Sequence, residues 1–117
     1  MIFKFEKITI WQKAMDFGEN IHQLVVKFPN YEMFGLSSQS RRAADSIALN
    51  IAEGSIDQSN PEQKRFMAYS IRSLAEVITC LHKAKRRNYI TEEEFQLRYE
   101  EAFNLMNMMV SFKRNIK

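Results

Sequence analysis

Apolar side chains recur along most of this chain at alternating steps of three and four residues, the spacing that places them on one side of an α-helix. The first such stripe predicts a helix from about Ile8 to Phe28. Pro29 ends this helix, because the residue before a proline avoids helical geometry. The predicted inward side chains are Ile10, Ala14, Phe17, Ile21, Leu24 and Phe28.

Three further helices follow from the same periodicity and from residues that favour helix ends. The second begins at Ser37 or Ser38, either of which can cap its first turn, and stops at Gly54, which tolerates a left-handed helix end. The third begins with Asn60 as its cap and runs to about Arg87. Its predicted inward side chains are Phe66, Met67, Ser70, Ile71, Leu74, Val77, Ile78, Leu81 and Ala84.

The fourth helix begins at Thr91, which forms a capping box with Glu94, and runs to about Ile116. The predicted inward side chains are Phe95, Tyr99, Ala102, Met106, Met109 and Val110. The chain has only 3 glycines and 2 prolines in 117 residues, which favours long helices joined by short antiparallel connections. The sequence therefore predicts an all-α protein, an antiparallel up-down-up-down four-helix bundle in which residues 1–117 form a single domain.

The second helix carries a polar stripe along the edge of its apolar side. Five polar side chains fall within an arc of about 80° when residues are placed 100° apart, namely Gln39, Arg42, Ser46, Asn50 and Glu53. One interpretation is a seam of hydrogen bonds and ion pairs between helices or subunits, and the other is a surface for a ligand or nucleic acid. The mixture of both charge signs with small amides favours the seam, because a phosphate-binding strip would be more uniformly basic.

Small side chains repeat every four residues beside this stripe, at Ser40, Ala44 and Ala48. They would let the backbone of another helix approach closely. The whole segment from Gly35 to Gly54 reads GLSSQSRRAADSIALNIAEG.

This segment resembles the signature of the bacterial four-helix-bundle proteins called 23S rRNA-intervening-sequence proteins, which show a G-L-[ST]-S-Q-x-R-R-A-x-x-S-I-x-x-N-I-A-E-G pattern. The resemblance extends to residues 10–14 of the first helix, 28–35 of the first connector and 73–76 of the third helix. Two positions depart from the family pattern. Ala48 stands where proline is frequent and should give a straighter helix, and Arg72 stands where a glycine is common.

The resemblance implies a bundle that commonly assembles as a ring-like pentamer. The genes of some family members lie within insertions of ribosomal RNA genes. A related branch accompanies the reverse transcriptases of diversity-generating retroelements, in which a basic pentameric barrel binds nucleic acid and polymerase. The biochemical role of most members is unestablished.

Apolar residues of the fourth helix extend beyond its predicted core stripe and indicate self-association. They fall on a second arc that should be polar in a monomeric bundle. These oligomer-interface candidates are Leu97, Leu105, Met108 and Phe112.

The net charge of +3 and the sequence pI near 9.1 permit nucleic-acid binding without requiring it. The outer side and the end of the third helix are the basic regions that could contact a polyanion, and a symmetric oligomer would repeat them. The nucleic-acid-binding candidates are Arg65, Arg72, Lys83, Arg86 and Arg87.

No pattern in the chain predicts catalysis, a cofactor or a metal site. His22 and His82 lack sequence partners that suggest metal ligation, and the single cysteine, Cys80, is expected to pack in the interior. No apolar run is long enough to span a membrane, and the first residues lack a signal-peptide layout, so we expect a cytoplasmic protein. Two functions stay open: an oligomeric interaction or scaffold protein, and an oligomeric RNA- or DNA-binding protein.

Overall fold

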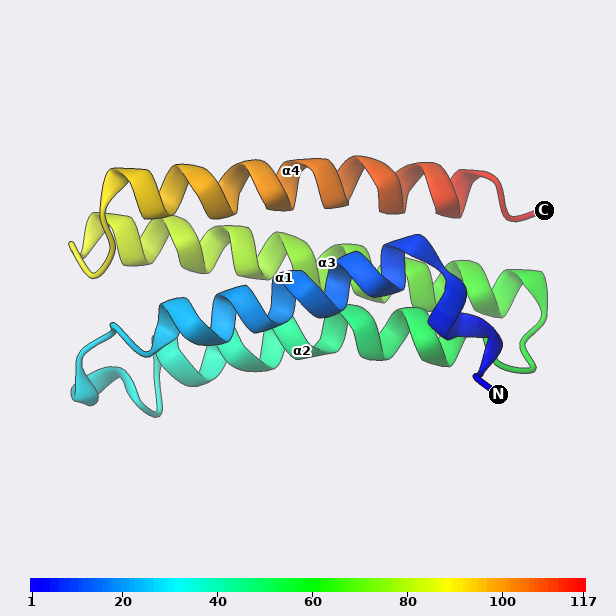
Figure 1. The fold of residues 1–117 in the computed structure, drawn as a ribbon, viewed down its shortest axis with the longest axis horizontal. Helices are drawn as coiled ribbons and strands as arrows, with labels where there is room; N and C mark the ends of the chain where they lie inside the picture. The colour runs from blue at the N-terminus through cyan, green and yellow to red at the C-terminus, as the bar shows by residue number, and fades with distance from the viewer.

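The computed structural model describes residues 1–117 and contains four long helices in the predicted order (Figure 1). They are α1 (Thr9–Val25), α2 (Leu36–Gly54), α3 (Asn60–Arg86) and α4 (Glu92–Arg114), with short 3-10 helices η1 (Lys4–Lys7) and η2 (Asn30–Glu32) before α1 and α2. Successive helices run in opposite directions, so both chain termini lie at the same end of the bundle (Figure 1). The predicted all-α, up-down-up-down four-helix bundle is confirmed.

Each helix packs against its neighbours in the chain, and α4 returns to α1, whereas the backbones of the diagonal pairs do not come into contact. The bundle therefore has four outer faces, which we name α1–α2, α2–α3, α3–α4 and α4–α1 after the helices that border each one. The contact between α2 and α3 is the most extensive, and α4 makes the least contact with its neighbours.

A single apolar core fills the space between the helices. The predicted inward stripes supply most of it, including the fully buried Phe17 and Leu74. Two buried serines direct their hydroxyls to backbone carbonyls: Ser40 Oγ donates to Leu36 O at 2.7 Å, and Ser70 Oγ donates to Ile47 O across the α2–α3 contact at 2.7 Å. No buried side-chain nitrogen or oxygen lacks a hydrogen-bond partner.

The predicted end of α1 is wrong, and the predicted start of α4 is confirmed. α1 ends at Val25, because the amides of Lys27 and Phe28 bond to carbonyls three residues back and tighten the chain into a turn. Phe28 nevertheless stays buried, at 8% exposure. At the start of α4, Thr91 Oγ1 accepts a hydrogen bond from the Glu94 amide at 3.1 Å, and Glu94 Oε1 accepts one from the Thr91 amide at 2.9 Å.

Neither Ser37 nor Ser38 caps α2. The helix begins one residue earlier, at Leu36, and the cap position is held by Gly35, which has no side chain to form a capping bond. The Leu36 amide instead donates a hydrogen bond to Oε1 of Glu32, which lies in the preceding connector, at 3.1 Å. Ser37 itself lies in the interior, at 5% exposure.

Two further end predictions need correction. Gly54 does not adopt a left-handed conformation, because it lies inside α2 and no glycine of the chain has a positive φ. A Cβ atom there would lie 2.7 Å from Phe66 Cβ, so this glycine allows α3 to approach α2. At the start of α3, Ser59 is the cap in place of Asn60, and its Oγ accepts the Glu62 amide at 3.3 Å.

Candidate interaction surfaces

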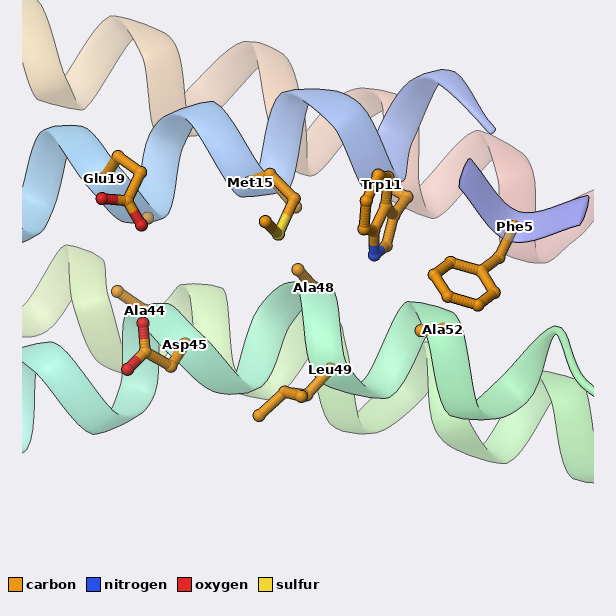
Figure 2. A pocket seen from close by; sticks show the side chains of 11 residues that line it. Phe5, Trp11, Met15, Glu19, Ala44, Asp45, Ala48, Leu49 and Ala52 are labelled. Atoms are coloured by element: carbon orange, nitrogen blue, oxygen red, sulfur yellow. The ribbon is translucent and has the colours of Figure 1, made fainter. Parts of the chain in front are cut away.

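An open apolar groove of about 400 Å³ lies between α1 and α2 (Figure 2). Its floor consists of small residues, which are Ala14, Gly18, Ala44, Ala48 and Ala52. Its walls are large apolar side chains, which are Phe5, Trp11, Met15 and Leu49. Met15 and Leu49 are 42% and 62% exposed, so the groove opens directly to solvent. The carboxylates of Glu19 and Asp45 lie together at one end (Figure 2).

The small residues set the depth of this groove. A Cβ atom added at Gly18 would lie 3.6 Å from the Ala44 carbonyl oxygen, so the gap between α1 and the α2 backbone is about one methyl group wide here. α1 and α2 are therefore close together at Gly18 and Ala44. The role of the whole row of small side chains in helix approach stays a prediction. At the end opposite the carboxylates, η1 folds back so that Phe5 meets the edge of Trp11, with ring centroids 5.3 Å apart.

The polar stripe of α2 and the basic stripe of α3 border the same face of the bundle. Gln39 Nε2 donates to Glu76 Oε2 of α3 at 3.4 Å. Beside this pair, a polar cleft of about 450 Å³ is lined by Arg42 of α2 and by Lys83 and Arg87 of α3. The structure thus brings together two sets of residues that the sequence alone places on separate helices with separate roles.

Most of the polar stripe is satisfied within α2. Ser46 Oγ donates to the Arg42 carbonyl at 2.9 Å, and Asn50 Nδ2 donates to the Ser46 carbonyl at 2.8 Å. The side chains of Arg42 and Glu53 are exposed and take part in no ion pair within the subunit. Only Gln39 reaches another helix, so the stripe is not a hydrogen-bonded seam inside the subunit. A role between subunits stays a prediction.

All five basic candidates of α3 are exposed, but they differ in their partners. Arg65 pairs with Glu62 on the same helix at 2.8 Å, and Arg87 pairs with Glu32 of the α1–α2 connector at 2.7 Å. The others have no ion pair within the subunit and are free to meet an anion; they are Arg72, Lys83 and Arg86.

The four interface candidates of α4 do not form an exposed patch. Leu105 is 3% exposed and belongs to the core, and Met108 and Phe112 are half-buried against it. Only Leu97, at 57%, is open, and it lies on the α4–α1 face. The physical reason is that this arc of α4 faces α1, which closes the bundle. A helical wheel of α4 alone cannot show on which side α1 packs.

The exposed apolar surface of α4 lies toward α3 instead. Phe103 is 56% exposed, and Val110, predicted to point inward, is 36% exposed. Tyr99 and Met106 are half-buried and share the same spacing of three and four residues. The Tyr99 ring meets His82 of α3 with centroids 6.0 Å apart, which places this side of α4 on the α3–α4 face. We call Tyr99, Phe103, Met106 and Val110 the α4 ridge.

Sequence reasoning missed the role of Glu32, which lies in η2 and ties together the connectors at one end of the bundle. Besides capping Leu36, its carboxylate accepts Arg87 Nη1 at 2.7 Å and the Tyr89 hydroxyl at 2.7 Å, both through Oε2. The hydrogen bond from Tyr89, followed by that from the Leu36 amide, lowers the pKa of Glu32. Burial, then the bonds to Tyr31 and Glu32, raises the pKa of Tyr89.

Comparison with known proteins decides the family. Over residues 6–111 the sequence matches the 23S rRNA-intervening sequence protein family. The chain belongs to this family. A crystal structure of a protein of unknown function from the S23 ribosomal protein family of Bacteroides thetaiotaomicron is similar, with a TM-score of 0.84 at 22% sequence identity, over 92% of this chain and 100% of that chain. At this identity the likeness shows a shared fold. No curated protein is significantly similar in sequence.

The remaining titratable groups of this 23S rRNA-intervening sequence family member are dispersed. His22 Nε2 lies 2.8 Å from Asp45 Oδ1, and His82 packs its ring edge against Phe95. Cys80 is buried, and burial raises the pKa of its thiol. No cluster of three or more His, Cys, Asp or Glu side chains could hold a metal ion. None of the helices combines the length and apolar character needed to cross a membrane.

Proposed function

We propose that this family member is a non-enzymatic, self-associating interaction protein whose α1–α2 groove is a contact surface. The observation that carries the proposal is the groove itself, which is lined mostly by apolar residues and open to solvent. A contiguous apolar surface exposed to water is typical of an interaction site, because covering it releases the water that it orders. The family resemblance favours a homo-oligomer, with a pentamer as the expected assembly.

The non-enzymatic part of the proposal rests on the surroundings of the unusual titratable groups. Glu32 and Tyr89, whose pKa values are shifted, bond to each other and hold two connectors in place. Cys80 packs in the core. Each of these groups has a structural contact that accounts for its position, which supports a scaffold role over a catalytic one.

Light scattering coupled to size exclusion tests self-association directly. We expect a mass several times the 13.9 kDa of one chain at micromolar protein concentration. A species of 13.9 kDa that persists as the concentration is raised would overturn the proposal.

Binding to single-stranded nucleic acid is a second candidate, favoured by one specific juxtaposition on the α2–α3 face. Phe34 is 93% exposed and lines the same polar cleft as Arg42 and Lys83, neither of which has an ion pair in the subunit. Exposed aromatic rings beside cations are suited to single strands, because bases stack on the ring while phosphates meet the positive charges.

Fluorescence anisotropy with a labelled single-stranded oligonucleotide tests this candidate at low salt. We expect Phe34→Ala and Lys83→Glu each to weaken binding severalfold, and added salt to weaken it steeply. Lys13→Glu makes the same charge change at an exposed position of α1 and serves as the matched control. Absence of binding by the unmodified protein at low salt, or an equal loss in the control, would remove the candidate.

A further inference from the structure

We infer that the α1–α2 groove of one copy receives the α4 ridge of a second copy in a head-to-tail contact. The inference rests on the proposed self-association and goes beyond it by naming the two surfaces that meet. One surface is a groove and the other is a row of side chains along α4, and both are apolar and open to solvent in the single subunit.

The groove is suited to accept large side chains from outside. Along α2 its floor runs from Ala44 through Ala48 to Ala52, a length of about 12 Å at 1.5 Å per residue. Because these floor residues end at Cβ, an inserted ring can reach the backbones of α1 and α2. Met15 and Leu49 flank the floor as flexible apolar walls (Figure 2).

The α4 ridge supplies the complementary shape. Phe103 and Val110 are its two exposed members and lie two helical turns apart, about 10 Å along the axis. This separation is shorter than the groove floor, so both side chains can occupy the groove together. Tyr99 and Met106 lie between and beside them and would cover the groove walls.

Charge sets the direction of the contact. Arg114 follows Val110 by four residues, so it continues the side of α4 that bears the ridge, and it is exposed without an ion pair. At one end of the groove, Glu19 likewise has no ion pair, while Asp45 contacts His22. An incoming α4 that runs parallel to α1 places Arg114 at this acidic end, whereas the antiparallel direction places it beside Trp11.

A second copy is favoured as the occupant because this chain carries both halves of the contact on opposite faces. The groove lies on the α1–α2 face and the ridge on the α3–α4 face, so no subunit can fill its own groove. A contact between two different patches is heterologous, and its repetition closes a ring or extends a filament. Each subunit in such an assembly has both its groove and its ridge covered.

Paired variants test the inference. Leu49→Glu places a charge in the groove wall, and Phe103→Asp places one on the ridge; both positions are exposed, at 62% and 56%. In sedimentation velocity we expect each variant alone to be a monomer. An equimolar mixture should form a dimer of twice 13.9 kDa and nothing larger, because each mixed pair retains one intact groove and one intact ridge.

Further variants separate this inference from the proposed function. Leu97→Asp, an equally exposed leucine on the α4–α1 face, should keep the unmodified assembly, and Ala48→Trp, which fills the groove floor, should behave like Leu49→Glu. If both Leu49→Glu and Phe103→Asp keep the unmodified mass, self-association uses other surfaces and the inference is wrong while the proposed function stands. If each variant alone is monomeric and the mixture is monomeric as well, the contact is not groove to ridge. If the unmodified protein is itself a monomer, both proposals fail and the groove belongs to a different partner.

Discussion

The α1–α2 and α4–α1 faces share helix α1, yet one is apolar and open and the other is closed by polar pairs. The α1–α2 groove has alanines in its floor and exposed Met15 and Leu49 in its walls. On the α4–α1 face, a smaller hollow of about 240 Å³ is bordered by Lys27 paired with Glu94. There, Asn20 donates to Glu101 at 2.8 Å as well.

The two faces differ in whether their side chains have partners within the subunit. Polar side chains on the α4–α1 face satisfy one another within the subunit, and Arg98 adds a further bond to Glu101 at 2.8 Å. The apolar walls of the groove have no such partner, and only a molecule from outside can remove them from water. One face therefore stabilises the subunit, and the other is available for association.

The largest expected effect is on assembly. Placing charges on both groove walls, Met15→Glu with Leu49→Glu, should weaken self-association by about a hundredfold or more, or roughly 3 kcal/mol. The free energy of unfolding of the dissociated subunit should change by only about 0.5 kcal/mol, because both side chains are exposed. Sedimentation and chemical denaturation measure the two quantities. A large loss of stability with assembly retained would show that the groove stabilises the subunit and is not an association surface.

A change to the opposite face should do the converse. Glu101→Ala leaves Asn20 and Arg98 without their partner and should lower the free energy of unfolding by about 1–2 kcal/mol while assembly is kept. Glu100→Ala is the matched control, because Glu100 is exposed and its carboxylate has only a 3.5 Å contact with Gln96. Equal losses in the two variants would show that the α4–α1 pairs contribute nothing specific.

The four helices follow from the sequence, whereas the packing of one helix against another follows from it only in part. Helical periodicity predicts four helices because burial of one apolar side is a local property of each helix. The capping box at Thr91 and the small residues at Ala44 and Ala48 are likewise read from short spacings. The assignment of Leu105 to an exposed interface fails because the position of α1 beside α4 depends on the whole bundle.

The α4 ridge and the contacts of Glu32 could not be predicted from sequence for the same reason. Phe103 falls outside the predicted inward stripe of α4, yet only the position of α3 shows that it lies on an open face. Glu32 caps a helix that begins four residues later and bonds to Arg87, far along the chain. Its position within the family-like connector was the one available signal.

Variation of pH sharpens the contrast between polar and apolar contacts. Because the folded state lowers the pKa of Glu32, its carboxylate contributes stability that is complete above the unfolded pKa of about 4.3 and is lost as pH falls through the folded pKa. Glu32→Gln should therefore unfold at lower denaturant than the unmodified protein at pH 7. The two should converge in acid, whereas an apolar groove variant should show no such convergence. A constant difference between Glu32→Gln and the unmodified protein across this range would contradict the assignment.

The smallest expected effect concerns the direction of the contact. Arg114→Gln and Glu19→Gln should each weaken self-association only about two- to fivefold, within the range of an exposed ion pair, and the double variant should be no weaker than either single one. High salt should abolish the difference. If the losses of self-association in the two single variants add in the double variant, Arg114 and Glu19 do not contact each other in the assembly.

Native mass spectrometry of a mixed sample tests the central claim most directly. Leu49→Glu protein labelled with nitrogen-15 is combined with unlabelled Phe103→Asp protein, so that the composition of every dimer is resolved. Groove-to-ridge association predicts dimers that each contain one labelled and one unlabelled chain, with no homodimer and no larger species. Monomers alone, or homodimers of either variant, would contradict it.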